Sequence, residues 1–492
     1  MKLFNSLSKR VEELKPVDDK KIIMYVCGLT PYDSAHIGHA RAFVSFDILK
    51  RFLIKKGFSV FHIQNITDVD DKIIKRCKET GADPKKLTET NHSEALALFG
   101  RIRIIPADVY PKVTEHISEI IAMVSTLIDK NHAYETQTGV YFDISSFACY
   151  GALSGQDLEL IRAGSRFEVD ESKKDPADFA LWKKTKGEIL EFESPWGRGR
   201  PGWHIECSAM SDKYAKRTLD IHGGARDLIF PHHENEIAQS EAFSGKRFCN
   251  CWVHTGFLTV EGEKMSKSLG NFITLGEALS KNTPNALRLF YMQAHYRSPL
   301  DYDPDLLESM EESVERIFNS LGLIREAQLG ANGSLESKGA KRAHHEDLEF
   351  RKKSDELISS FYKHMEDDLN TPEAIASLYS LLRLANSHIS AGIDPEQITK
   401  VRESLEGILW VLGLEEEKKG IGEKADALSS LLEELGGKKV ETAEKALEAL
   451  ISMRDLAREA KDYKRSDIIR SKLKSIGIIL EDKAGGIRWK IA

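Results

Sequence analysis

The chain has 492 residues, which at roughly 100–200 residues per domain predicts about three domains and excludes a small scaffold held together by disulfides. Hydrophobic residues make up 41% of the chain and charged residues 30%, as in ordinary globular proteins. The 70 Lys and Arg residues against 77 Asp and Glu residues give a net charge of −7. The overall field of the protein therefore does not indicate a general binder of polyanions.

The cysteines are sparse and irregularly spaced, at Cys27, Cys77, Cys149, Cys207, Cys249 and Cys251. This pattern lacks the density of a secreted disulfide framework and indicates reduced thiols. The N-terminal residues MKLFNSLSKRVEELKP are interrupted by charges too early for a signal peptide. No stretch approaches the ~20 apolar residues of a membrane span. We therefore predict a cytoplasmic protein without a membrane partner.

The first 130 residues alternate between strand-like and helix-like patterns. Residues 21–27 (KIIMYVC) form an apolar run typical of a buried strand, and residues 58–67 form a second such run. Between them, HIGHARAFVSFDILKRFLIKKG has helical spacing and stops at Gly57. A strand, a helix and a strand in this order favour an α/β fold with a doubly wound, Rossmann-like parallel sheet.

The rest of the chain changes character several times. The α/β pattern returns at residues 217–224 and 248–260, and helical periodicity dominates 301–413, with a polar interruption at 330–347 that we interpret as a loop of a helical bundle. The tail ends in a pattern that predicts a β-hairpin around Gly485 and Gly486. We predict a catalytic domain in two halves, 1–130 and 196–260, an insertion at 131–195, a junction at 261–300, a helical bundle at 301–413 and a small mixed domain at 414–492.

The strongest local motif is His36-Ile37-Gly38-His39, placed where a strand has ended and a helix begins. The N-terminus of a helix exposes unpaired backbone N–H groups and favours anions. The two imidazoles, three residues apart, can donate to phosphate oxygens, and Gly38 lets a flat base approach the backbone. A pair of histidines at helical spacing is also common without a function, so the motif alone does not decide the matter.

A second motif is Lys264-Met265-Ser266-Lys267-Ser268, followed by Leu269-Gly270-Asn271. Two lysines among small hydroxyl residues suit a mobile loop that closes over a triphosphate. A solvated surface loop is the ordinary interpretation of such a charge run. The presence of HIGH about 225 residues upstream in the same chain favours the functional interpretation, because the pair is far more specific than either part.

A third set of residues suggests a metal site. His232 and Glu236 are four residues apart after Pro231, which would place an imidazole and a carboxylate on one helix face, and Cys27 and Cys207 could add thiolates to complete four zinc ligands. A paired helix face with two buried thiols is the ordinary alternative. Cys249-x-Cys251 is a competing metal motif that we interpret as core, and we place His233 off the face of His232 and Glu236.

These residues together resemble the cysteinyl-tRNA synthetases, a family of class I aminoacyl-tRNA synthetases. The segments YVCGLTPYDSAHIGHAR, NITDVDDKII, SPWGRGRPGWHIECSAM, DIHGGARDLIFPHHENEIAQSE and KMSKSLGN are similar to that family's sequences. The match covers the chain from Leu3 to the C-terminal LEDKAGGIRWK, in the family's order. The resemblance implies a nucleotide-binding fold of the HIGH/KMSKS type, an insertion, a helical bundle and an anticodon-binding end at 414–492.

The resemblance also implies an activity: ATP-dependent activation of L-cysteine to cysteinyl-adenylate, followed by transfer to tRNA(Cys). It makes His36, His39, Lys264 and Lys267 the catalytic residues, with Gly38 and Asp227 beside them at the ATP. It places Gly28, Thr67 and Trp203 in the amino-acid pocket. Cys27, Cys207, His232 and Glu236 fall on the family's zinc positions, with one Zn²⁺ per chain, and Mg²⁺ would accompany ATP. We expect a monomer.

The implied chemistry follows from physical principles. Attack of a carboxylate on the α-phosphate of ATP concentrates negative charge on phosphate oxygens and needs little proton transfer, so catalysis is positioning plus charge stabilisation. Serine is nearly isosteric with cysteine, and a pocket wall alone separates such isosteres only by ~10²-fold. A soft metal that binds the substrate thiolate would separate them better.

Two other functions share parts of this evidence. An ATP-dependent ligase that joins cysteine to an amino sugar, as in the mycothiol ligase, would share the HIGH, KMSKS and zinc residues. A non-catalytic tRNA-binding protein derived from a synthetase would be expected to lose those residues first. The tail favours RNA over an amino sugar, because residues 451–492 hold 11 Lys and Arg against 6 Asp and Glu, a local +5, with Tyr463 and Trp489 among them. A solvated amphipathic helix would account for the same charges.

Overall fold

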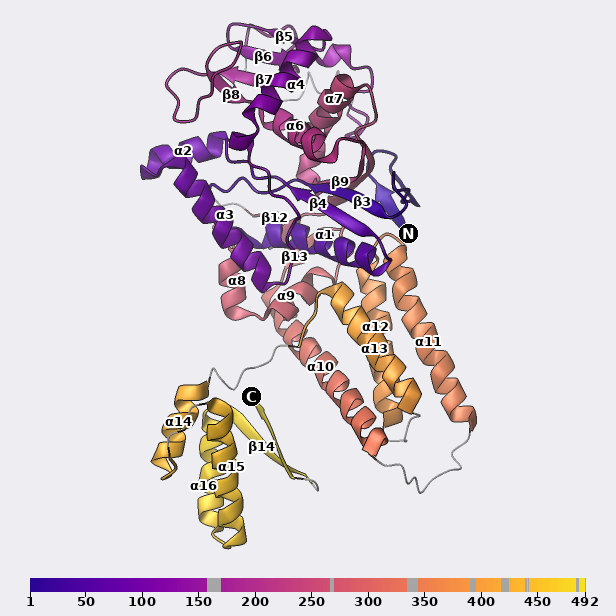
Figure 1. Ribbon diagram of the computed structural model, residues 1–492, viewed down its shortest axis with the longest axis vertical. Coiled ribbons are helices and arrows are strands. Elements are labelled where there is room, and N and C mark those ends of the chain that lie inside the picture. Colours follow the sequence, from indigo (N-terminus) through magenta and orange to yellow (C-terminus); the bar gives the residue numbers. More distant parts are fainter. Residues whose placement is uncertain are drawn as a thin grey trace. The chain divides into compact units, whose positions relative to one another are not determined.

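The computed structural model describes residues 1–156, 170–265, 270–333, 344–389, 395–416, 424–438, 440, 442–483 and 486–491. The chain divides into two compact units, Met1–Leu414 and Glu415–Ala492 (Figure 1). Among the described residues, no helix has the length and the apolar run that crossing a membrane would need.

A four-stranded parallel sheet lies at the centre of the larger unit. Its strands are β3 (Lys21–Val26), β4 (Ser59–Gln64), β9 (Leu219–Ala225) and β10 (Cys249–Thr255), in the order β10-β9-β3-β4. Successive residues of β3 pack into different hydrophobic clusters, Ile22 and Met24 with α1 (Ile37–Lys55), and Ile23 and Tyr25 with residues of the helices on the other face. Both faces are covered, which agrees with the apolar run of β3 after Lys21. The predicted doubly wound parallel sheet is confirmed.

The helices of this sheet follow the strands as the sequence predicts. The segment from β3 through α1 to β4 is the predicted strand–helix–strand unit. The opposite face is covered by α6 (Trp203–Ala215) and α7 (Glu234–Ser244), and α2 (Asp71–Thr80) and α3 (Pro84–Arg101) follow β4. A short antiparallel pair, β1 (Lys2–Asn5) and β2 (Arg10–Glu13), lies against the edge strand β10. The strand order reverses between β3 and β9, which is where ligands bind in such sheets.

A second, antiparallel sheet interrupts the α/β pattern. Its strands are β5 (Ala133–Glu135), β6 (Gly139–Phe142), β7 (Phe179–Lys184) and β8 (Gly199–Pro201), preceded by α4 (Ile117–Asp129). They share a core with α4, α6 and α7, in which Phe142 and Trp182 are fully buried. The last strand, β8, lies beyond residue 195, the predicted end of the insertion.

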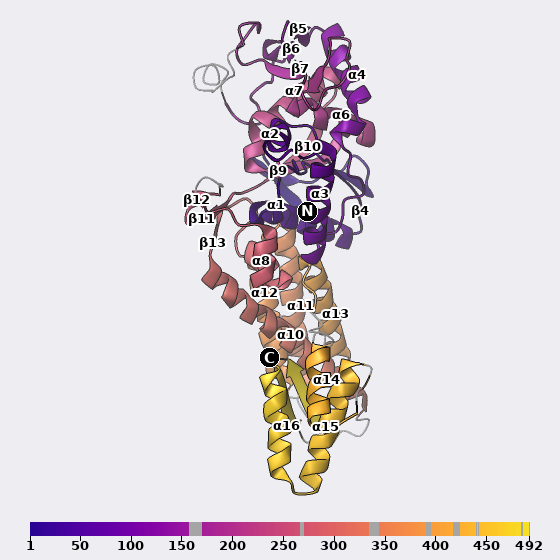
Figure 2. The ribbon, with the colours of Figure 1, turned by 90° about the vertical axis from the view of Figure 1, so that its left-hand side faces the viewer.

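The α1 side of the parallel sheet continues into the helical bundle. The junction holds β11 (Leu258–Val260), β12 (Glu263–Lys264), β13 (Leu300–Tyr302), α8 (Leu275–Lys281) and α9 (Pro284–Tyr291), and the bundle holds α10 (Pro304–Gly333), α11 (His344–Glu366), α12 (Thr371–Ile389) and α13 (Pro395–Leu412). One hydrophobic core runs from α1 through α9 into these helices. Figure 2 shows the bundle helices on the α1 side of the sheet. Helices α10 and α11 extend into both ends of the predicted interruption at 330–347, whose centre lies outside the described residues.

The smaller unit, Glu415–Ala492, has its own core. It contains α14 (Ala425–Glu434), α15 (Ala443–Glu459), α16 (Tyr463–Ser475), β14 (Ile478–Lys483) and β15 (Gly486–Ile491). Leu431, Leu447, Ile469 and Leu480 are among its buried residues. Strands β14 and β15 pair antiparallel, so the predicted C-terminal hairpin is confirmed, although Gly485 in its turn lies outside the described residues.

Candidate functional site

The candidate site lies at the carboxyl ends of β3, β4 and β9, beside the reversal of strand order. Cys27 follows β3, and its backbone N–H donates to the Gly223 carbonyl of β9 (3.0 Å). Gly223 and Gly224 allow this close packing, because a Cβ on Gly223 would lie 2.6 Å from the Val253 carbonyl, and one on Gly224 would lie 2.7 Å from the Leu228 side chain. The DIHGGA segment thus brings the ends of β3, β9 and β10 together.

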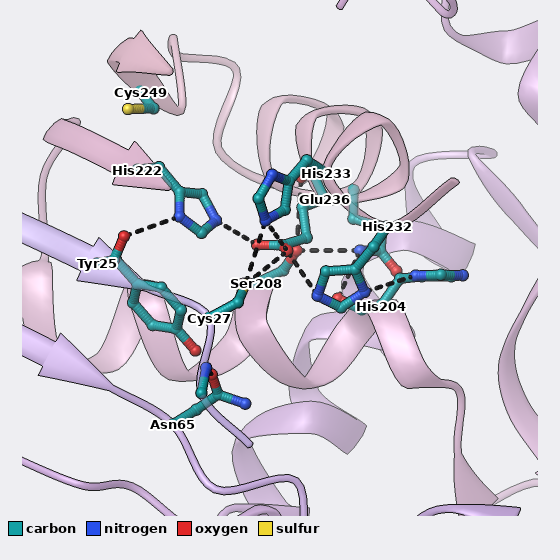
Figure 3. A network of polar contacts seen from close by, with 12 residues as sticks. Tyr25, Cys27, Asn65, His204, Ser208, His222, His232, His233, Glu236 and Cys249 are labelled. Atoms are coloured by element: carbon teal, nitrogen blue, oxygen red, sulfur yellow. Dashed lines mark hydrogen bonds and ion pairs between the residues drawn. The ribbon is translucent and has the colours of Figure 1, made fainter. Parts of the chain in front are cut away.

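The four residues predicted to bind a metal converge in this place. Ligand atoms of Cys27, Cys207, His232 and Glu236 all lie within 4.8 Å of one another, and all four side chains are buried. His232 Nε2 is 2.9 Å from Glu236 Oε1, and Cys27 Sγ is 3.7 Å from the same oxygen (Figure 3). Ligands of a tetrahedral zinc ion, each about 2.0–2.3 Å from the metal, are roughly 3.3–3.8 Å apart. The donor set therefore fits zinc, and the Cys27–Glu236 distance lies within this range, whereas His232 and Glu236 lie closer, at hydrogen-bond distance.

The electrostatics of these side chains agree with a cation site. Burial raises the pKa of Glu236, but His222 and His232 outweigh it and lower the value to about 2. Burial lowers the pKa of His232, but the Glu236 carboxylate and Cys207 raise it to about 10. Burial and the neighbouring Cys207 raise the pKa of Cys27. Two thiols and a carboxylate share this buried space with the positive charge of His232, and a bound cation would take over the role of that charge.

Histidines that the sequence did not single out surround the four ligands. His222, on β9, directs Nδ1 at the Tyr25 carbonyl (3.0 Å) and Nε2 at Glu236 Oε2 (2.8 Å), so it donates from both nitrogens and holds the carboxylate. His204 Nδ1 lies 2.9 Å from His232 Nδ1, which leaves His232 Nε2 directed at Glu236. Contacts of this kind orient metal ligands. A histidine at the carboxyl end of a predicted strand was the available signal for His222.

The expectation that His233 lies off the ligand face is wrong. His233 Nε2 is 3.2 Å from Cys27 Sγ and 3.9 Å from Glu236 Oε1, and a second overlapping group of possible ligands comprises Cys27, His222, His233 and Glu236. The reason is geometric. His233 and Glu236 are three residues apart, a spacing that also shares a helix face. In addition, Phe230 has extended backbone angles (φ −136°, ψ 132°), so Ile229–His233 is not a regular helical turn.

The residues predicted for the amino-acid pocket lie around the four candidate metal ligands. The Gly28 N–H donates to Asn65 Oδ1 (2.9 Å), and Asn65 Nδ2 donates to Thr67 Oγ1 (3.1 Å). A Cβ on Gly28 would lie only 1.8 Å from the Asn65 carbonyl oxygen, so this position requires glycine. Trp203 is 39% exposed, and its ring lies 4.4 Å from the His232 ring between centroids. Asn65, which links two predicted residues, was not identified from the sequence.

The HIGH motif forms the start of α1. His36 caps the helix, its Nδ1 accepting from the backbone N–H groups of Gly38 (3.1 Å) and His39 (3.3 Å), and the His36 N–H donates to His39 Nδ1 (3.3 Å). The rings stack with centroids 3.6 Å apart. Burial, together with His36 and Lys72, lowers the pKa of His39 well below its usual value. A neutral His39 whose Nδ1 accepts a hydrogen bond carries its proton on Nε2.

The chain around the KMSKS motif returns to the HIGH motif. The Ile37 N–H donates to the Ile273 carbonyl (3.2 Å), and a Cβ on Gly38 would lie 3.0 Å from the methyl group of Met265. Lys264 ends β12, and Lys267 lies outside the described residues. Asp227 is exposed in the short 3₁₀ helix that follows β9.

The competing Cys249 and Cys251 are both buried in the hydrophobic core, and neither belongs to a possible metal group within the described chain.

Comparison with known proteins places this fold and site in one class. Residues 13–312 match the family model described as tRNA synthetases class I (C) catalytic domain, and residues 360–416 match the DALR domain. Among solved structures, Mycobacterium tuberculosis methionyl-tRNA synthetase in complex with methionyl-adenylate superposes with a TM-score of 0.60 over 80% of this chain and 89% of that chain, at 15% identity. The Agrobacterium radiobacter K84 LeuRS, in a ternary complex with tRNA, gives 0.62 over 82% and 85% at 11% identity. The protein has the fold of a class I aminoacyl-tRNA synthetase.

Sequence relatives identify the family within that class. The chain is 44% identical to the cysteine–tRNA ligase of Thermococcus gammatolerans over 100% of this chain and 99% of the relative. It is 45% identical to that of Carboxydothermus hydrogenoformans over 100% of both. The chain therefore belongs to the cysteine–tRNA ligase family, and it is an enzyme of the ligase class. The match includes the C-terminal unit, which argues against the amino-sugar ligase.

Proposed function

We propose that this enzyme activates L-cysteine with ATP to cysteinyl-adenylate and transfers the cysteinyl group to tRNA(Cys), with zinc recognising the substrate side chain. The observation that carries the proposal is the convergence of the four ligand atoms of Cys27, Cys207, His232 and Glu236 within 4.8 Å, beside Gly28 at the carboxyl end of β3. A bound zinc ion would supply a soft Lewis acid that takes the substrate as a thiolate.

The remaining residues of the pocket orient the amino acid. Thr67 is 3% exposed, and Asn65 fixes its hydroxyl beside Gly28. Trp203 covers one side of the His232 ring and forms a wall of the pocket. This arrangement would hold the cysteine carboxylate toward the start of α1, where ATP binds.

The ATP side relies on positioned hydrogen-bond donors. His39 donates from Nε2 to a phosphate oxygen, and His36, stacked on it, acts from the helix N-terminus. Lys264 and Lys267 add positive charge from the KMSKS segment, and Mg²⁺ accompanies the phosphates. Asp227, after β9, binds the ribose. Gly38 leaves room for the base.

We propose that residues 414–492 bind the anticodon of the tRNA. Tyr463 is 61% exposed and Trp489 is 38% exposed in this unit, and Lys464 and Arg465 follow Tyr463 on α16. Exposed aromatic rings beside basic side chains are typical of proteins that stack on single-stranded RNA loops. The monomeric state and the cytoplasmic location stay predictions from the sequence.

Replacement of one ligand tests the zinc proposal. Cys207→Ser should lose bound zinc, and its preference for cysteine over serine in ATP–pyrophosphate exchange should fall to about 10²-fold or less, the discrimination that pocket shape alone provides. Cys249→Ser is the matched control, because Cys249 is an equally buried thiol outside the ligand group, and it should keep both metal and selectivity. A Cys207→Ser enzyme with full zinc content and unchanged selectivity would overturn the assignment.

Charging of total tRNA with labelled cysteine tests the reaction itself. The proposal predicts ATP-dependent attachment of cysteine to tRNA. Cysteine-dependent pyrophosphate exchange without charging of any tRNA would instead support a ligase that acts on a small acceptor.

A further inference from the structure

A polar pocket lies between the second halves of α6 and α7 and is lined by none of the four candidate zinc ligands. Its volume is about 140 Å³. Its walls include the apolar residues Met123, Phe243 and Phe248, and Ser208, Ser211 and Ser240 line it as well. The amino-acid and ATP sites proposed above do not use this pocket.

Two of its hydroxyl groups are buried without a hydrogen-bond partner among the described residues, Ser211 Oγ and Ser240 Oγ. The two residues are 1% and 6% exposed. Helical serines commonly donate to the carbonyl four residues earlier, and Ser244 Oγ does so to the Ser240 carbonyl (2.7 Å). Because an unsatisfied buried hydroxyl is unfavourable, two such groups lining one pocket point to a ligand that accepts hydrogen bonds.

Positive charge lines the same pocket. Lys216, Arg217, Lys246 and Arg247 contribute to its lining, and the acidic residue beside them is Asp212. The Arg247 guanidinium donates to the backbone carbonyls of Cys249 (3.0 Å) and Asn250 (3.2 Å), which hold it in place. Lys216 and Lys246 are exposed and form no ion pair within the part of the chain that the structure describes. Arg217 pairs with Asp220 (2.8 Å), which leaves Lys216, Lys246 and Arg247 against Asp212, and this excess of positive charge favours an anion.

We propose that this pocket binds a small free oxyanion of the phosphate class, inorganic phosphate or a small phosphate monoester. The hydroxyls of Ser211 and Ser240 would donate to its oxygens, and Lys216 and Lys246 would neutralise its charge. A pocket of about 140 Å³ with such buried serines accommodates a small free anion more readily than the backbone of a polynucleotide. Such a ligand joins α6 to α7, the helices that carry Cys207 and Glu236. Ser208, at the same pocket, lies 3.4 Å from the Glu236 carbonyl.

Calorimetric titration of the full-length enzyme with inorganic phosphate tests the proposal. The enzyme is first saturated with a non-hydrolysable ATP analogue, so that phosphate cannot occupy the ATP site. We expect one phosphate to bind. Affinity should fall about tenfold or more in the double variant Ser211→Ala with Ser240→Ala, and severalfold in Lys246→Met. Lys213→Met is the matched control, since Lys213 lies on α6 outside the pocket and pairs with Glu119.

The expected outcome has a second readout in thermal stability. Phosphate should raise the melting temperature of the wild type more than that of the serine variant, because the ligand stabilises only the state that binds it. Two results would overturn the proposal. One is no binding at about 10 mM phosphate. The other is equal affinity in all variants, which would mean an adventitious ion only. Lys246→Met changes an exposed side chain and so keeps the test valid if the serine variant does not fold. Weaker tRNA binding in these variants with no phosphate binding would also overturn it.

Discussion

Two groups of buried ionisable side chains, on opposite faces of the parallel sheet, show different ways of keeping charge inside a protein. On the α1 side, Asp47 accepts from Arg51 (2.8 Å) and Arg288 (2.6 Å). Arg288 also donates to the carbonyls of Leu412 and Ile102, each at 2.9 Å. The charges in this group are compensated by the chain itself, and it joins α1, α9 and the end of α13.

On the α6 and α7 side, the buried ionisable groups include thiols and imidazoles that can bind a metal. Glu236 pairs with His222 (2.8 Å) and His232 (2.9 Å). The ligand atoms of Cys27, Cys207, His232 and Glu236 nevertheless all lie within 4.8 Å of one another, as in a site that binds a cation. The Asp47–Arg288 network stabilises the fold by itself, whereas the four convergent ligand atoms would be stabilised by a bound cation. The two groups should therefore respond differently to substitution: the first through stability, the second through metal binding and activity.

The largest expected effect is on stability, from Arg288→Met. The substitution leaves the carbonyls of Leu412 and Ile102 without this donor and removes one cation from Asp47, and loss of one partner from a buried ion pair costs about 3–5 kcal/mol. Urea unfolding measures it. Arg325→Met is the matched control, because the Arg325–Glu406 pair is 40% and 35% exposed, and it should cost no more than about 1 kcal/mol. Equal losses in the two variants would contradict the contrast drawn above.

The next effect is on catalysis at the start of α1. His39→Asn keeps a side chain that can accept from the His36 N–H, but it removes the imidazole Nε2 donor. The rate of cysteine activation, measured as ATP–pyrophosphate exchange, should fall by about 10²–10³-fold, the effect of losing one preorganised donor to a developing charge. The unfolding free energy should change by less than about 1 kcal/mol. A rate within threefold of the wild type would refute the assigned role of His39.

The sequence predicted much of this site because the key residues stand next to element boundaries. Cys27 and Gly28 end an apolar strand, His36 begins a helix, and His232 and Glu236 have helical spacing. Spacing alone does not join Cys27 and Cys207, which are far apart in sequence, to this site; the resemblance to the synthetase family did. Long-range partners had no such signal. Asp47 and Arg288 are separated by 241 positions, and each, taken alone, looks like a solvated helix residue.

The mistake over His233 has a related cause. Its interpretation assumed a regular helix from Pro231 onward, but the helix α7 begins at Glu234, after an irregular segment. His222 was missed for another reason: its role depends on Glu236 and the Tyr25 carbonyl, which only the tertiary fold brings to it. Periodicity predicts which face a residue shares with its neighbours along the chain, but not what another element places against that face.

A smaller effect should follow from His222→Leu, which removes the hydrogen bond from His222 Nε2 to Glu236 and the bond to the Tyr25 carbonyl that orients the His222 ring. We expect the affinity for zinc to fall about 10–100-fold, as is typical when the partner of a metal ligand is lost. Competition with a chelator of known affinity measures the change. His254→Gln is the control, because His254 bonds to Ser6 and His233 and not to Glu236, and its affinity should stay within threefold. A loss of equal size in both variants would show that general repacking, not the hold on Glu236, sets zinc affinity.

The smallest effect concerns His62, a buried histidine that belongs to neither group. Both of its ring nitrogens lack a hydrogen-bond partner among the described residues, and burial, with Lys50, lowers its pKa to about 3. The unfolded chain protonates this histidine near pH 6.5 and the folded protein does not, so its contribution to stability is present above pH 6.5 and is lost as the pH falls toward 3. Between pH 7.5 and pH 5.5, the wild type should lose about 1.4 kcal/mol more unfolding free energy than His62→Phe. Urea unfolding of both proteins at the two pH values measures this difference. Equal losses of unfolding free energy in the two proteins would contradict the prediction. They would show that His62 binds a proton in the folded state as readily as in the unfolded chain, although it is buried and has no paired charge or ligand among the described residues.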